Sequence, residues 1–211
     1  MTSLRDKAYD YIRDKIITCE YMPGTTLDEK KLMEETGCGR TPVREALTVL
    51  SSNGLVNILP RRGMFVSSVS IKDIHDIYEL KQEIEPMIIR SYGSHVSREK
   101  LQEFQTFFSS ELDYFHYSVE DAAFHATLTD ASDNRYYTQI LNVVSDQSQR
   151  IRMLTNIDPE RLKESNREHL TVIDAMLQRD WNRAADAMVE HYKKSLDNIM
   201  RFDFASEYIT R

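Results

Sequence analysis

The sequence predicts a mostly α-helical chain of two modules, with three helices and a β-hairpin in residues 1–68 and an all-α antiparallel bundle of about six helices in residues 69–211. Glycine and proline together supply 11 of 211 residues, which is too few for a loop-rich β-sandwich. Apolar side chains recur three and four residues apart over most of the chain, which is the period of an amphipathic helix. Charge also divides the chain, because residues 1–70 carry a net charge of +1 and residues 71–211 carry −8.

Ordinary start and stop signals define the elements of the first module. Asp28 is a preferred N-cap, Pro42 suits the first turn of a helix, and Gly37 and Gly54 stand where helices commonly end. The expected elements are a helix from Leu4 to Ile16, a helix from Asp28 to Gly37, a helix from Arg40 to Asn53, and a hairpin whose strands LVNIL and MFVSS flank Pro60–Gly63.

From Ser70 onward the pattern predicts helices and no further strand. The expected elements are a helix carrying Ile74, Ile77, Tyr78, Ile84, Met87 and Ile88 with a kink at Pro86, a segment from Ser97 to Leu112, a helix capped by Ser118, a helix from Asn134 to about Leu154, and helices over about 161–179 and 181–202. The short segment 178–180 separates the last two, so we expect them to run antiparallel.

A short helix, a glycine turn and a helix that opens with two arginines are the arrangement that lays a recognition helix in a major groove of DNA. Arg40 and Arg44 lie four residues apart on one side of the helix, where a guanidinium reaches phosphate or the O6/N7 edge of guanine. A lone helical arginine is usually a solvated surface group, so the order of elements carries this interpretation. Further candidates are Thr41 and Lys30 for phosphate contacts, and Arg62 and Gly63 for the neighbouring minor groove.

The second module contains a candidate metal site. Asp121 and His125 are four residues apart, so a carboxylate and an imidazole share one helix face. Alone this pair is weak evidence, because Ser118-x-x-Asp121 also fits a capping box and a single helical histidine is commonly a packed core residue.

Two downstream histidines strengthen the metal hypothesis. His169 and His191 each lie 11 residues from Asp180, so a reversal there brings both to the same level, about 16 Å from the turn. One carboxylate plus three imidazoles suits a first-row divalent ion such as Zn²⁺, Ni²⁺ or Mn²⁺.

Residues 23–66, PGTTLDEKKLMEETGCGRTPVREALTVLSSNGLVNILPRRGMFV, resemble the winged helix-turn-helix of the GntR family of bacterial transcription regulators. The motifs RTPVREAL, NGLV and Arg-Gly before an apolar strand stand where the family has them. The resemblance implies that Lys30, Arg40, Arg44 and Gly63 contact operator DNA. The family usually has serine at Gly39 and commonly arginine at Lys30, where lysine suits phosphate better than bidentate base contact.

The segments DAAFHATL and EHLTVIDAMLQRDWNRAADAMVEHY, with Asn134 between them, are similar to the FCD effector domain of the FadR-type branch of this family. The similarity extends over most of residues 71–205. It implies that Asp121, His125, His169 and His191 are metal ligands, and it favours a small effector over a fatty acyl one. A count of six helices resembles the shorter, VanR-like subgroup.

Effectors of similar regulators are often small carboxylates such as sugar acids or dicarboxylates. An anion gains from a divalent cation inside a bundle, and an arginine can clamp its other end. Arg150, Arg152 and Asn134 are the candidates for this clamp. Lys81 stands where the family commonly has an arginine, four residues before the glutamate of an LE-P-like segment.

The sequence therefore predicts a homodimeric, effector-responsive regulator that binds an inverted repeat of double-stranded operator DNA. We expect a cytoplasmic protein without membrane contact, because no apolar run reaches the roughly 18–20 residues of a membrane span. One alternative is a metal-dependent enzyme, but we find no further carboxylate at helical spacing beside the four ligands, so we expect no enzyme activity. Another alternative is a regulator whose ion is purely structural.

Overall fold

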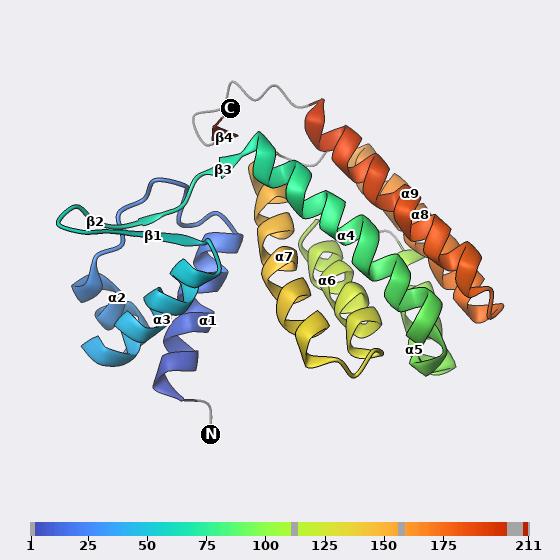
Figure 1. The fold of residues 1–211 in the computed structure, drawn as a ribbon, viewed down its shortest axis with the longest axis horizontal. Coiled ribbons are helices and arrows are strands. Elements are labelled where there is room, and N and C mark those ends of the chain that lie inside the picture. The colour runs from blue at the N-terminus through green and yellow to red at the C-terminus, as the bar shows by residue number, and fades with distance from the viewer. Residues whose placement is uncertain (1–2, 111–113, 156–158, 202–208, 211) are drawn as a thin grey trace. The chain divides into compact units, whose positions relative to one another are not determined.

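The structure is a computed structural model that describes residues 3–110, 114–155, 159–201 and 209–210 (Figure 1). The chain divides into two compact units, which are described separately below. The first comprises Met1–Lys72, Gln149–Leu154 and Phe204–Arg211, and the second comprises Asp73–Ser148 and Thr155–Asp203.

The first unit begins with the three expected helices, α1 (Leu4–Ile17), α2 (Glu29–Thr36) and α3 (Arg40–Ser52). α1 presents one apolar residue per turn to the interior, and α2 and α3 supply the facing side chains. The buried core of these helices consists of Ala8, Ile12, Ile16, Leu32, Val43, Ala46, Leu47 and Leu50. This packing fixes where the exposed face of α3 lies on the unit.

The turn between α2 and α3 forms as the sequence indicated. The carboxylate of Asp28 accepts a hydrogen bond from the backbone N–H of Lys31 at 2.8 Å and caps α2. Gly37 ends α2 in the left-handed region, with φ of 65°, where a side chain would be strained. Gly39 opens α3 without a side-chain hydrogen bond. Pro42 is the third residue of α3 and has no N–H, so this helix start has one donor fewer to satisfy.

A β-hairpin follows α3, as predicted. Strands β1 (Val56–Leu59) and β2 (Gly63–Val66) pair antiparallel, with Val56 opposite Val66 and Leu59 opposite Gly63. The expectation of no later strand is wrong, because β3 (Val69–Ser70) pairs in parallel with β4 (Ile209–Thr210). A two-residue pairing is too short to leave an alternating pattern in the sequence.

The second unit is helical, and the described residues contain the six α-helices that the sequence predicted. They are α4 (Ile71–Tyr92), α5 (Arg98–Phe108), α6 (Tyr114–Asp130), α7 (Arg135–Leu154), α8 (Pro159–Leu177) and α9 (Trp181–Met200), with a short 3₁₀ turn, η1 (Gly93–His95), after α4. The first two residues of α4 and the last six of α7 group with the first unit. None of the described helices combines the length and apolar character needed to cross a membrane.

Two of the predicted helix starts can be compared directly with the structure. Ser97 caps α5 by accepting the N–H of Lys100 at 3.1 Å, as expected. The cap expected at Ser118 is wrong, because α6 already begins at Tyr114 and Ser118 is a buried residue inside the helix. Leu112 lies outside the described residues.

The α4 and α8–α9 segments determine the geometry of the bundle interior. α4 continues through Pro86 as one helix of 22 residues, and its buried positions extend from Ile74 to Ile89. Asp180 caps α9 by accepting the N–H of Arg183 at 3.1 Å, and the chain reverses between α8 and α9 as predicted. Buried aromatic rings of Phe104, Phe108 and Phe124 pack together beside α8.

Candidate metal centre and DNA-binding face

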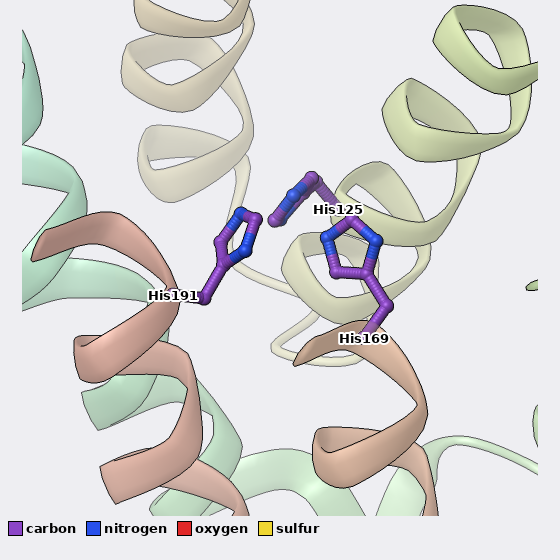
Figure 2. Close-up of side chains that lie close together, drawn as sticks. All are labelled: His125, His169 and His191. Carbon is purple, nitrogen blue, oxygen red and sulfur yellow. The ribbon is translucent and has the colours of Figure 1, made fainter. Parts of the chain in front are cut away.

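Three buried imidazoles converge inside the second unit (Figure 2). His125 comes from α6, His169 from α8 and His191 from α9, and one ligand atom from each lies within 4.8 Å of the others. The ring centroids of His169 and His191 are 4.5 Å apart, because the reversal at Asp180 places them at the same level. The expected juxtaposition of this pair is therefore present.

Asp121 lies one turn before His125 on α6 and is buried beside the histidines. Its Oδ1 is 3.8 Å from Nε2 of His125 and 3.6 Å from Nε2 of His169. The Tyr117 hydroxyl donates to the same Oδ1 at 2.9 Å, and its oxygen is 2.5 Å from Oγ of Ser165. The structure thus brings together all four residues that the sequence suggested as metal ligands.

Two glutamates contact the outer nitrogens of the histidines. Oε2 of Glu85 lies 2.6 Å from Nδ1 of His125, and Oε2 of Glu168 lies 2.8 Å from Nδ1 of His191. An ionised carboxylate only accepts hydrogen bonds, so in each neutral ring Nδ1 donates and the lone pair stands on Nε2. Nε2 of His125 is buried and has no hydrogen-bond partner among the described residues.

The electrostatics of the site favour ionised Glu85 and Glu168 and a neutral His191. Burial opposes ionisation of Glu85, but the nearby His125 and Lys81 outweigh it and lower the pKa of Glu85 to about 2. Burial likewise opposes ionisation of Glu168, and hydrogen bonds from His191 and Arg161 lower its pKa to about 2. Burial also lowers the pKa of His191, which favours its neutral form. Neutral imidazole is the form that binds a metal.

The sequence shows no further carboxylate at helical spacing beside the four candidate ligands, but in the structure Glu85 and Glu168 each contact one of the histidines. A signal for Glu85 exists in the sequence. The buried positions of α4 recur at four- and three-residue steps, and Lys81 and Glu85 occupy this otherwise apolar stripe between Tyr78 and Ile88. Glu168 gives no such signal, because it is only partly buried and follows the exposed Arg167 on α8.

Lys81 extends the polar network of the site. Its side chain is only 2% exposed, and Nζ lies 3.8 Å from Oε1 of Glu85 and 3.4 Å from Oγ of Ser148. The ammonium also lies 5.0 Å from the ring centroid of Tyr192, whose hydroxyl is 3.0 Å from Nδ1 of His125. Lys81 therefore joins the same set of contacts as His125.

The other three candidates for effector contact lie on or beside α7. Asn134 precedes this helix and accepts the N–H of Tyr136 at 3.0 Å. Arg150 is fully buried within the first unit, where its guanidinium donates to the carbonyl oxygen of Ser67 and, at 3.0 Å, to the hydroxyl of the same residue. Arg152 is half-buried in the last turn of α7.

The candidate DNA-contacting residues lie on the surface of the first unit. Arg40 opens α3 and Arg44 follows one turn later, with side chains 68% and 61% exposed. Nε of Arg44 lies 2.7 Å from Oε1 of Glu29, and Nε of Arg40 lies 3.7 Å from Oε2 of the same carboxylate. The remaining candidates, Lys30, Thr41, Arg62 and Gly63, are also exposed.

Both units of the chain contain regions that match known protein families. The pattern described as bacterial regulatory proteins of the gntR family matches residues 4–66, and the pattern of the FCD domain matches residues 76–194. The chain belongs to the GntR family. It is a bacterial GntR-family transcriptional regulator with an FCD effector domain, and it carries three converging histidines in a domain type that binds metals.

Full-length relatives of this GntR-family chain include named regulators. It is 25% identical over 206 residues to the HTH-type transcriptional repressor RspR of Escherichia coli (strain K12), covering 93% of this chain and 89% of RspR. It is 23% identical over 198 residues to the uncharacterized HTH-type transcriptional regulator YdhC of Bacillus subtilis (strain 168), covering 90% and 88%. The solved structure of E. coli McbR/YncC has the same fold, with a TM-score of 0.82 at 19% identity over 95% of this chain and 99% of that one.

Replacing Glu168 tests whether its carboxylate positions His191. Glu168→Gln keeps the shape of the side chain but loses the charge that holds Nδ1–H of His191, so we expect Zn²⁺ affinity to fall about 10–100-fold. Competition with a chromophoric chelator measures this affinity. The control Glu160→Gln changes the same charge at an exposed position of α8 and should leave it unchanged. Equal Zn²⁺ affinity in both variants would contradict the positioning role.

Proposed function

We propose that this regulator binds an inverted repeat in operator DNA as a homodimer in the bacterial cytoplasm, and that a small organic acid alters its operator affinity. The acid binds beside a divalent ion held by Asp121, His125, His169 and His191. The observation that carries this proposal is the convergence of three buried imidazoles next to a buried carboxylate. We divide the chain into a DNA-binding domain, residues 1–68, and an effector and dimerisation domain, residues 69–211.

The residues present fit a divalent ion. A buried polar atom without a partner is costly, and Nε2 of His125 is such an atom among the described residues. Three imidazole nitrogens and one carboxylate oxygen suit Zn²⁺, Ni²⁺ or Mn²⁺. When bound, the ion supplies positive charge that attracts a carboxylate. The chain's own contribution is to hold the imidazoles, through Glu85 on His125 and Glu168 on His191.

The geometry supports Lys81 best among the candidate effector contacts. A carboxylate inside a bundle of low dielectric is stabilised by nearby positive charge, and the Lys81 ammonium is buried in the network that includes His125. Asn134, Arg150 and Arg152 stay as candidates from the sequence. An effector changes operator affinity only by the difference between its affinities for the DNA-competent and DNA-incompetent states.

A test of effector response separates this function from both alternatives. Operator affinity of the metal-loaded protein is measured with a panel of sugar acids and dicarboxylates, and the same mixtures are analysed for products. We expect at least one acid to change operator affinity by about 5–150-fold, the usual range of allosteric coupling, without being consumed. Turnover of an acid would support a metal-dependent enzyme, and equal affinity with every acid would support a purely structural ion.

The double variant His169→Ala/His191→Ala tests the metal centre. Native mass spectrometry of the wild-type protein should give a dimer with one divalent ion per chain, and the variant should lose the ion because two of four ligands are gone. His75→Ala removes an exposed histidine of α4 and should retain the ion. Undiminished metal content in the double variant would refute the proposed ligands, and a monomeric wild type would refute the dimer.

Arg44→Ala tests the recognition helix. Removing the guanidinium should abolish operator-specific binding while helicity and dimerisation stay intact, because the Arg44 side chain is 61% exposed. Fluorescence anisotropy with labelled operator measures the binding, and circular dichroism checks the fold. Arg183→Ala removes an exposed arginine of α9 and should bind as the wild type does. Retained operator specificity in Arg44→Ala would contradict the assignment of α3 as the recognition helix.

A further inference from the structure

We propose that Glu29 determines the DNA specificity of this regulator by holding both arginines of the recognition helix and weakening their attraction for DNA of arbitrary sequence. The inference rests on the DNA-binding function and on the proposed contacts of Arg40 and Arg44. It adds Glu29 to the residues that control DNA binding, although the negative charge of Glu29 itself would repel a phosphate.

Glu29 is the first residue of α2, and its carboxylate faces the start of α3. One oxygen accepts Nε–H of Arg44 at 2.7 Å, and the other lies 3.7 Å from Nε of Arg40. The Glu29 side chain is 22% exposed, whereas the two arginines are 68% and 61% exposed. A single carboxylate therefore lies under both arginines, whose outer parts remain in solvent.

The atom used in these contacts matters for base recognition. A guanidinium has one Nε–H and four terminal N–H donors. The hydrogen bond from Arg44 uses Nε, so the terminal fork that binds O6 and N7 of guanine is left to face DNA. A free arginine loses rotamer entropy when it docks, and Glu29 orders this side chain before DNA arrives.

The charge of Glu29 acts on all DNA alike. Contacts to phosphate are independent of sequence and supply most of the non-specific affinity. With Glu29 between them, Arg40 and Arg44 present a net charge of one rather than two to the phosphates. Base contacts at the operator compensate for this reduced attraction, whereas other DNA offers no such compensation. Glu29 thus separates operator affinity from non-specific affinity.

The fold of α2 does not depend on this side chain. Asp28 caps the helix, Gly37 ends it, and Leu32 anchors it in the core. Substitution of Glu29 therefore leaves the scaffold of the DNA-binding face in place. Glu34 lies on the same helix, is exposed and has no described contact with either arginine, so it supplies a control of equal charge.

The test compares two DNA duplexes, one that the wild-type protein selects from a random-sequence library and one of the same composition in shuffled order. Anisotropy measures the affinity of Glu29→Ala, Glu29→Gln and Glu34→Gln for both at several salt concentrations. For Glu29→Ala we expect tighter binding to the shuffled duplex, weaker binding to the selected one, and a specificity ratio about tenfold lower, the effect of one mismatched base pair. Its salt slope on shuffled DNA should steepen by about 0.9, the value for one further phosphate contact.

Glu29→Gln separates charge from orientation. The amide oxygen still accepts Nε–H of Arg44, so this variant should gain affinity for shuffled DNA while keeping more of its affinity for the selected duplex than Glu29→Ala does. Glu34→Gln should leave the ratio unchanged. The inference is overturned if Glu29→Ala changes both affinities by the same factor, or if Glu34→Gln matches Glu29→Gln. Failure of the wild type to select any duplex would instead overturn the DNA-binding function itself.

Discussion

The burial of imidazoles and carboxylates between helices is the constraint on which the second unit depends. Each polar group removed from water must find a partner, or the fold loses a large fraction of its stability. Glu85 on α4 meets His125 on α6, and Glu168 on α8 meets His191 on α9. Hydrogen bonds have direction and fixed length, so these pairs set the rotation and level of each helix more sharply than apolar packing does.

The same constraint explains why each of the two buried glutamates also contacts a cationic side chain. Both terminal nitrogens of Arg161 donate hydrogen bonds to the carboxylate of Glu168, at 2.9 and 2.8 Å. Nη2 also donates to Oγ of Ser195 at 2.9 Å. Lys81 plays the corresponding part for Glu85, although at 3.8 Å. Each histidine–glutamate pair is thus backed by a cation, and the charge of each carboxylate is balanced whether or not an ion is bound.

The first unit depends on apolar packing rather than on buried histidine–glutamate pairs. The core between its three helices is apolar, with Ile12, Leu32 and Leu47 packed together, and the arginines that open α3 are exposed. A rigid apolar core positions the backbone of α3, and surface ion pairs then adjust the side chains on it. Such exposed pairs contribute little to stability, so Glu29 is free to serve recognition instead.

Local signals made much of this structure predictable. The N-cap at Asp28 and the left-handed Gly37 are encoded within one or two helical turns, and the equal spacing of His169 and His191 from Asp180 is encoded within one helical hairpin. Contacts between distant segments leave no periodic trace, and these are the ones that sequence reasoning missed. They include the pairing of β3 with β4, the partners of Glu168, and the bonds from Arg150 to Ser67, 83 residues away. The helix cap predicted at Ser118 was wrong for a different reason, because the same capping pattern also occurs inside a longer helix.

The reversal at Asp180 also bears on how the histidine cluster assembles during folding. His169 and His191 are separated by 22 residues within one helical hairpin, whereas His125 lies 44 residues before His169. Loop-closure entropy grows with the logarithm of this separation, by about 0.6 kcal/mol for each doubling, and contacts within a hairpin form early. Bringing His169 and His191 together within this hairpin therefore costs about 0.6 kcal/mol less loop entropy than bringing His125 to His169, so the reversal at Asp180 makes this pair the less costly part of the cluster to assemble.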